Sequence, residues 1–280
     1  HGVRHLIGGQ LVASPSDFDV IDPATGALAA TAPRAGREEL DAAVACARQA
    51  QPRWADTDVN DRRAALVALA QVLRDSEQEL GALIALEQGK PILAARTEVS
   101  RSAMLLESLV SLDLGAEGVR DDATARVEVR HRPIGVVGAI APWNMPIGLS
   151  VPKMVHALYT GNTLVLKPSP FAPLTVLRLA ELVKDVFPPG VLNVLAGDHE
   201  LGRWMGEHAG IDKISFTGSI ATGREVMRTS SANLKRLTLE LGGNDAAIVL
   251  DDADVSQIAR ALCDASFVNS GQVCMAIKRL

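Results

Sequence analysis

Aromatic residues are scarce in this chain, and it has no cluster of positive charge. Phe, Trp and Tyr together make up 3% of the 280 residues, and only one of them is a tyrosine. The formal net charge is −5, with acidic and basic residues mixed along the chain. Surfaces that bind nucleic acid combine basic runs with aromatic side chains, so this composition argues against nucleic acid as a partner.

Cysteine is equally rare, and its pattern excludes two kinds of site. The three cysteines, Cys46, Cys263 and Cys274, are odd in number and widely spaced. They form neither a disulfide framework nor a CxxC metal motif, and the six histidines show no HExxH spacing. We therefore expect no metal site and a reducing, cytoplasmic location.

The sequence also lacks a segment suited to a membrane. Residues 133–152 carry no charge over 20 positions, which is long enough to cross a bilayer. Pro142, Pro146 and several glycines interrupt this stretch, so it predicts a strand followed by a loop. The N-terminal residues from His1 lack the charged and then apolar pattern of a signal peptide. We expect no contact with a membrane.

What is present is a globular composition with a repeated strand–turn–helix pattern. Apolar residues make up 48% of the chain, which is enough for a sizeable core. From residue 134 onward, short apolar runs alternate with helical patterns, as in a parallel sheet covered by helices on both faces. The expected strands are residues 134–140, 163–166, 191–195, 214–216, 236–239 and 247–250. The expected helices are residues 153–159, 175–187, 202–208 and 221–228.

The first 122 residues predict a layer of amphipathic helices with a few short strands. Apolar side chains recur at helical spacing in residues 38–54, 62–86 and 92–114. Strands are expected within residues 6–12 and 19–21. Residues 126–132 then alternate polar and apolar side chains, which is typical of an exposed ribbon or of an edge that pairs with a partner.

One strand–helix turn has the character of an anion site. Parallel sheets bind ligands at the carboxyl ends of their strands. Residues 216–223 read FTGSIATG, so Gly218 and Ser219 lie between a strand end and a helix start. Free N–H groups at a helix start favour an anion such as a diphosphate, although a serine there is also a common helix cap. The motif is neither a P-loop nor GxGxxG.

Two further turns add a cation and an amide. Lys167 follows an apolar strand, where its ammonium could hold ribose or phosphate oxygens; the alternative is a solvated surface lysine. Asn144 lies two residues from Pro142 and two from Pro146, so its backbone is restricted. A rigidly held amide can donate to an oxyanion, and the alternative is an Asx-type turn.

The last two candidates are a carboxylate and a thiol beside glycines. One residue separates Glu240 from the Gly-Gly pair that follows it. Cys274 follows the sequence NSGQV, which predicts a loop rather than a core segment. A thiolate is a strong nucleophile and a carboxylate can act as a general base. Lone cysteines are more often small buried apolar residues, which is our interpretation of Cys46 and Cys263.

The order of these motifs resembles the aldehyde dehydrogenase superfamily. PWN, KPS, FTGSxxxG, LELGG and GQxC occur in family order and spacing, and the resemblance covers almost the whole chain. It implies an α/β fold with a Rossmann-like NAD(P)-binding sheet, an antiparallel oligomerisation ribbon and the start of a second α/β catalytic domain. The implied divisions are residues 1–122 for the N-terminal part, 123–133 for the ribbon, 134–243 for the cofactor-binding domain and 244–280 for the catalytic domain.

The resemblance also implies a role for each candidate. Cys274 matches the nucleophile and Glu240 the general base. Asn144 matches the oxyanion-binding amide, and Lys153 a structural or catalytic lysine near it. The implied cofactor contacts are Pro142, Trp143, Lys167, Ser169, Gly218, Ser219, Gly223, Leu241 and Gly242. The implied reaction oxidises an aldehyde to a carboxylic acid through a thiohemiacetal and a thioester on Cys274, with deacylation by water that Glu240 activates.

Two departures from the family pattern bear on these expectations. Pro170 stands where many members have a glutamate that holds the ribose hydroxyls, so we expect NAD while NADP stays open. The chain also ends at Leu280, six residues after Cys274 and ahead of most of the family's catalytic domain. An inactive cofactor-binding fragment is therefore one alternative, beside a CoA-acylating aldehyde dehydrogenase and a thiol esterase. A homodimer or homotetramer is expected of a complete protein.

Overall fold

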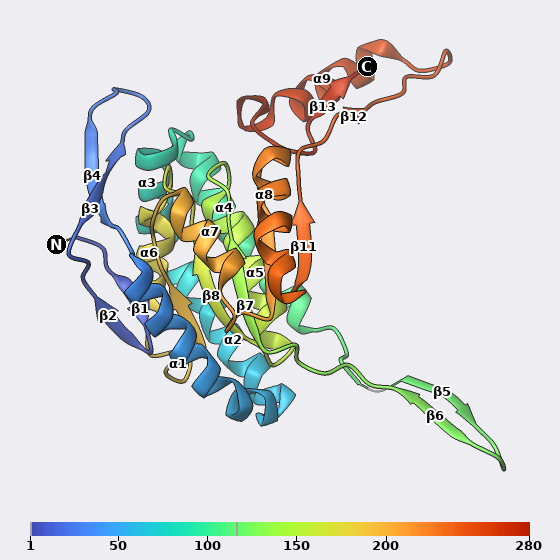
Figure 1. Cartoon of the computed structure of the whole chain (residues 1–280). Coiled ribbons are helices and arrows are strands. Elements are labelled where there is room, and N and C mark those ends of the chain that lie inside the picture. The colour runs from blue at the N-terminus through green and yellow to red at the C-terminus, as the bar shows by residue number, and fades with distance from the viewer. Residues whose placement is uncertain (1, 116) are drawn as a thin grey trace.

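The fold is built on a seven-stranded, mostly parallel sheet. The computed structural model describes residues 2–115 and 117–280 (Figure 1). The strands of the sheet are β1 (His5–Ile7), β2 (Gln10–Val12), β7 (Val136–Ile140), β8 (Thr163–Lys167), β9 (Leu192–Val194), β10 (Lys213–Thr217) and β11 (Arg236–Glu240). Their order is β11-β10-β7-β8-β9-β1-β2, and the first five run parallel. The predicted α/β fold is confirmed.

Helices cover both faces of this sheet and create two cores. One face is covered by α2 (Val59–Asp75), α3 (Glu77–Gln88), α4 (Ile92–Val110), α5 (Pro146–Tyr159) and α6 (Leu174–Leu182). The other face is covered by α1 (Arg37–Asp56), α7 (His199–Glu207) and α8 (Ile220–Ser230). The strand alternation explains the division, because Leu164 and Leu166 of β8 join the first core and Val165 the second.

Two hairpins lie outside the sheet. One is β3 (Asp17–Ile21) with β4 (Leu28–Pro33), and the other is β5 (Glu117–Asp121) with β6 (Arg126–Val129). Figure 1 shows the second hairpin extending away from the body of the molecule. It begins before the predicted position 123, because the Asp122 carboxylate accepts the N–H groups of Thr124 and Ala125 and closes a turn there.

The C-terminal segment lies beyond one end of the sheet. It contains β12 (Asp245–Ala246), α9 (Val255–Phe267) and β13 (Ile277–Arg279), and Figure 1 shows these elements past the ends of α8 and β11. The predicted strand at residues 247–250 is wrong. Ladder pairing with β13 ends at Ala246, followed by one hydrogen bond from the N–H of Ala247 to the carbonyl oxygen of Arg279, and within the described residues no strand pairs with residues 248–250. An apolar run therefore stays irregular where its backbone groups find no ladder.

The charge-free stretch also differs from its prediction as strand and loop. Its first part is β7, whose five residues are all buried. Its second part is helical, because α5 begins at Pro146 rather than near residue 153. A proline at the first helical position fits, since no N–H is needed there, and Pro152 lies further along inside the helix. No helix of the described residues is long and apolar enough to span a bilayer.

A buried amide joins the end of α5 to the entry into β7, and it provides a test of the fold. Asn162 Oδ1 accepts the N–H of Ile134 at 2.6 Å and the N–H of Gly135 at 2.9 Å. Replacement by alanine leaves both donors without this acceptor, so Asn162→Ala should lower the free energy of unfolding by roughly 2 kcal/mol or more. Urea unfolding measures it. The exposed Asn244→Ala is the control, and equal small losses in both variants would contradict this account.

Candidate active site

The candidate residues gather where the order of strands reverses. From β7 the chain moves outward through β8 and β9, and then returns to place β10 and β11 on the other side of β7. The carboxyl ends of β7 and β10 therefore form a switch point, where parallel sheets open a crevice for ligands. The turns after β7 and β10 carry Asn144 and Ser219, while Lys167 and Glu240 are the last residues of β8 and β11.

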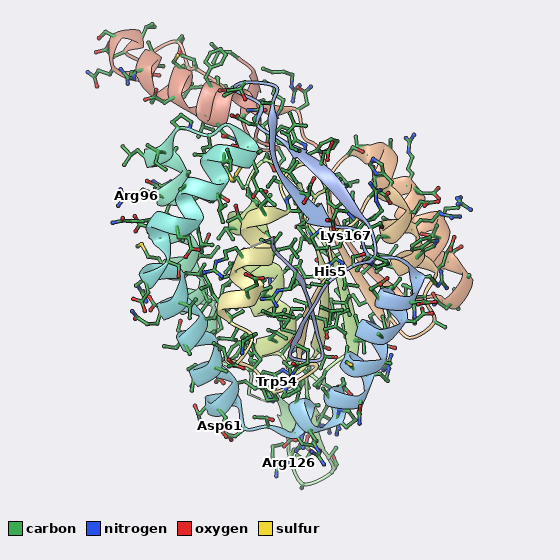
Figure 2. The ribbon with its side chains drawn as sticks, turned by 90° about the vertical axis from the view of Figure 1, so that its left-hand side faces the viewer. His5, Trp54, Asp61, Arg96, Arg126 and Lys167 are labelled. Carbon is green, nitrogen blue, oxygen red and sulfur yellow. The ribbon has the colours of Figure 1, made fainter. Side chains whose placement is uncertain are left out.

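Lys167 is a buried cation at this edge. Its side chain is 3% exposed, and Nζ donates to the carbonyl oxygen of Pro168 at 3.2 Å, its one acceptor within residues 2–115 and 117–280. An ammonium has three N–H donors, so two can serve a ligand. Burial lowers the pKa of Lys167 to about 8, and the nearby charge of Asp198 opposes this. Figure 2 shows Lys167 far from Trp54, which lies toward the amino ends of the strands.

The turn after β10 combines a helix cap with close packing. Ser219 Oγ accepts the N–H of Thr222 at 3.1 Å, so Ser219 caps the N-terminus of α8. A Cβ on Gly218 would lie 2.6 Å from the ring of Phe216, and a Cβ on Gly223 would lie 2.7 Å from Leu241. A side chain at either position would have to displace the Phe216 ring or the end of Leu241, so the two glycines allow the strand, the turn and α8 to lie this close. The first turn of α8 stays exposed, as an anion site needs.

The loop that leads to Cys274 has a conformation that few sequences adopt. Asn269, Ser270 and Gly271 have φ values of 52°, 58° and 76°, all in the left-handed region. Glycine and asparagine tolerate this region best, and serine less well. The side chain of Gln272 donates to the carbonyl oxygen of Asn269 at 3.0 Å and braces the loop. Cys274 emerges from it exposed to solvent.

Asn144 is tied directly to this loop. Its Nδ2 donates to the carbonyl oxygen of Gln272 at 2.7 Å, and its own carbonyl oxygen accepts from Asn269 Nδ2 at 3.2 Å. The amide has a second N–H, which the first bond leaves free and fixes in direction. The structure thus brings together Asn144 and the Cys274 loop, which are 128 residues apart at Gln272.

Glu240 approaches the same region through the backbone. The carbonyl oxygen of Glu240 accepts the N–H of Gly218 at 3.0 Å, and its side chain is exposed. Gly242 is open, and a Cβ on Gly243 would lie 3.0 Å from the carbonyl oxygen of Cys274. Gly243 therefore lets the chain after β11 pass beside the backbone of the cysteine.

Lys153 is placed differently from the other candidates. It projects from α5 toward the sheet, and Nζ donates to Ser215 Oγ at 3.1 Å rather than to the Asn144 turn. Burial lowers the pKa of Lys153 to about 8, and the charge of Glu240 opposes this shift. Trp143 is partly exposed beside Asn144, while Ser169 is buried and Pro170 half-buried after Lys167.

The sequence interpretation missed the charged residues beneath these turns. Gly89 ends α3 in the left-handed conformation. Two of its neighbours, Glu87 and Lys90, are buried. Burial raises the pKa of Glu87 to about 7, although N–H donors from the start of α6 oppose the shift. Glu98 of α4 is buried beside Lys90. The sequence signal that could have revealed these buried groups is the placement of charged residues close to the predicted helix ends.

A separate cavity lies at the other end of the sheet. Its volume is about 630 Å³, and its lining includes Cys46, Trp54 and Pro189. None of the candidate residues lines it. Among the described residues, no group of three or more potential His, Cys, Asp or Glu ligands converges on one point.

Comparison with known proteins assigns the chain to a family. The sequence profile described as "Aldehyde dehydrogenase family" matches residues 11–280. The chain belongs to this family. The aldehyde dehydrogenase LUC3 of a Fusarium species is 38% identical over 277 residues, which are 99% of this chain and 59% of that protein.

Solved structures of other aldehyde dehydrogenases and of a related enzyme share the fold. An NAD⁺ complex of an aldehyde dehydrogenase from Bacillus cereus is 35% identical with a TM-score of 0.94, and the match covers 99% of this chain and 58% of that one. An NADP-dependent enzyme from E. coli is 33% identical with a TM-score of 0.94, covering 99% and 59%. The chain thus spans about three fifths of the length of the relatives it matches.

The buried amine of Lys153 should make stability depend on pH. Between about pH 8 and 10.5, the unfolded chain holds a proton on this lysine that the folded chain has released. The free energy of unfolding should therefore rise with pH across this window. Lys153→Met should reduce the slope, while the buried Lys167 retains its own contribution. Urea unfolding at a series of pH values measures the slope. The control is the partly exposed Lys184→Met, and equal slopes in all three proteins would refute the prediction.

Proposed function

We propose that these residues form the cofactor-binding and nucleophilic part of an NAD(P)-dependent aldehyde dehydrogenase that acts through Cys274. The observation that carries the proposal is the pair of hydrogen bonds between the Asn144 turn and the Cys274 loop. They tie the Asn144 turn to the loop that leads to the Cys274 thiol, at the switch point of a parallel sheet. That combination suits chemistry in which a thiol attacks a carbonyl and an oxyanion develops.

The residues at the carboxyl edge fit a dinucleotide. Lys167 offers two free N–H donors in a buried setting, suited to ribose hydroxyls. The exposed start of α8, with Gly218 and Ser219, suits a diphosphate. Trp143 and Leu241 supply apolar surface nearby. Bound NAD(P) supplies the hydride acceptor of the oxidation.

The role of Cys274 follows from its exposure and its neighbours. Its thiolate attacks the carbonyl carbon of the aldehyde and forms a thiohemiacetal. The free N–H of Asn144 and the backbone N–H of Cys274 donate to the developing oxyanion. A donor of this kind typically stabilises such a transition state by roughly 3–4 kcal/mol. Loss of hydride from the same carbon leaves a thioester on Cys274.

Glu240 completes the cycle as the general base. Its exposed carboxylate is on the last residue of β11, and Gly243 after this strand passes the backbone of Cys274, so we expect Glu240 to deprotonate a water near the thioester. The water attacks the thioester, the carboxylic acid leaves and the thiol is restored. The retained carboxylate supports water rather than CoA as the acceptor. Lys153 donates to Ser215 of β10, the strand that pairs with β11, and we expect it to act there as a structural group.

We propose NAD as the preferred cofactor, although Pro170 supplies no carboxylate to repel the 2′-phosphate of NADP. The NAD⁺ complex of the Bacillus cereus aldehyde dehydrogenase, which is 35% identical to this chain, supports the choice of NAD. The β5–β6 ribbon supports a homodimer or homotetramer, because it projects from the body as a pairing surface. The three free cysteines support a cytoplasmic location.

The first test removes the nucleophile. Cys274→Ala should abolish aldehyde-dependent NADH formation and leave NAD binding unchanged, because the thiol is absent from the proposed cofactor contacts. Turnover is measured in a full-length form, which is a protein as long as the relatives that contains these 280 residues. Binding of NAD and of NADP is measured by calorimetry in both lengths. Cys263→Ala should keep both properties, at a cysteine that is exposed and not buried as the sequence suggested. Full activity in Cys274→Ala would refute the assignment.

The second test separates acylation from deacylation. Glu240→Gln keeps the shape but removes the base, so the full-length form should release a burst of NADH and then turn over slowly. General-base catalysis typically contributes a hundredfold or more, and the steady rate should fall by roughly that factor. Stopped-flow absorbance resolves the two phases. Glu225→Gln, on the exposed face of α8, should behave as the wild type. A normal steady rate without a burst would show that another group activates the water.

A further inference from the structure

A buried ion pair lies directly beneath the Asn144 turn. It joins Lys90, which follows α3, to Glu98 of α4, and the two side chains are 4% and 7% exposed. Both residues come from the N-terminal helical layer, which carries none of the candidate residues. A buried charge pair contributes little to stability compared with apolar side chains of the same size, so its contacts have to explain its presence.

Those contacts hold the Asn144 turn from both sides. Lys90 Nζ donates to the carbonyl oxygen of Asn144 at 3.0 Å. Glu98 Oε1 accepts the N–H groups of Ile147 at 3.0 Å and Gly148 at 2.9 Å, in the first turn of α5. Met145, at the start of this helix, provides no side-chain cap. The carboxylate of Glu98 therefore replaces the missing cap, and Lys90 links it to the residue before the helix.

We propose that Lys90 and Glu98 are positioning residues for the oxyanion-binding amide of Asn144, a role that rests on the proposed function. The carbonyl of Asn144 is fixed by Lys90 from below and by Asn269 from the Cys274 loop. With its backbone held, the side chain can keep one N–H on Gln272 and direct the other at the reacting carbonyl. Loss of the Lys90 contact lets the turn shift relative to the thiol.

The test uses an acyl transfer that needs no cofactor. The Cys274 thiolate attacks the carbonyl carbon of p-nitrophenyl acetate, an oxyanion forms, and p-nitrophenolate leaves with the electron pair of the broken C–O bond. A thioester remains. Release of p-nitrophenolate gives the rate, and mass spectrometry of the peptide that contains Cys274 assigns it to this thiol. The assay uses the 280-residue chain.

The main variant is Lys90→Met with Glu98→Gln. Both charges are removed together, so no unpaired buried charge remains, and the amide oxygen of glutamine can still accept from α5. Acylation of Cys274 should slow by about tenfold to a hundredfold, the range expected when a reacting group is displaced by about an ångström. Lys90→Arg alone retains a donor, so its acylation rate should lie between the rates of the double variant and the wild type.

A second reaction distinguishes positioning from general damage. Iodoacetamide alkylates the same thiolate by displacing iodide, and no oxyanion forms. Its rate should be unchanged in the double variant if Lys90 and Glu98 act through Asn144. A matched pair on the surface, Arg74 and Glu107, bridges α2 and α4. Arg74→Met with Glu107→Gln should change neither rate.

A mutant cycle with Asn144→Ala tests whether Lys90 and Glu98 act through Asn144. Asn144→Ala alone should slow acylation, and the Lys90 and Glu98 substitutions should add no further loss in that background. A full additional loss there, or equal slowing of alkylation, would overturn the positioning role while leaving the proposed function intact. Unchanged acylation in Asn144→Ala would overturn both, because there would be no oxyanion donor to position.

Discussion

The hydrogen bond from Asn144 Nδ2 to the carbonyl oxygen of Gln272 is the contact on which the candidate site depends. It links the turn after β7, at the centre of the sheet, to a loop that is far away in sequence. That loop contains three successive left-handed residues and ends in an exposed thiol, so it needs an external anchor to keep one direction. A reacting group that is free to move by an ångström loses much of its effectiveness.

Buried carboxylates extend this anchoring into the N-terminal helices. Glu98 accepts N–H groups at the start of α5, and Glu87 accepts those of Leu174 and Thr175 at the start of α6. Neither helix has a side-chain cap of its own. The unpaired N–H groups and positive ends of the two helices compensate for burying the charge. Helices expected only to cover the sheet therefore support the turns that follow β7 and β8.

Local patterns predicted much of the fold. They failed where strand pairing or packing decides whether a segment is regular and where it begins. The strands around the switch point, together with α7 and α8, were placed to within a few residues, because apolar periodicity and turn glycines are local signals. The strand at residues 247–250 failed because a strand needs a neighbour, and the neighbour β13 pairs only as far as Ala246. The early start of α5 was missed because prolines were interpreted as breaks, although Pro146 occupies the one position where a helix tolerates it best.

The sequence by itself determined the chemistry available and the layer each residue joins. The alternation in β8 assigns Leu164 and Leu166 to one core and Val165 to the other, and five motifs in order identified the family. Only the tertiary structure decided which groups meet. The approach of Asn144 to Gln272 and of Lys90 to Asn144 depends on the path of the chain between them, and local periodicity carries no information about that path.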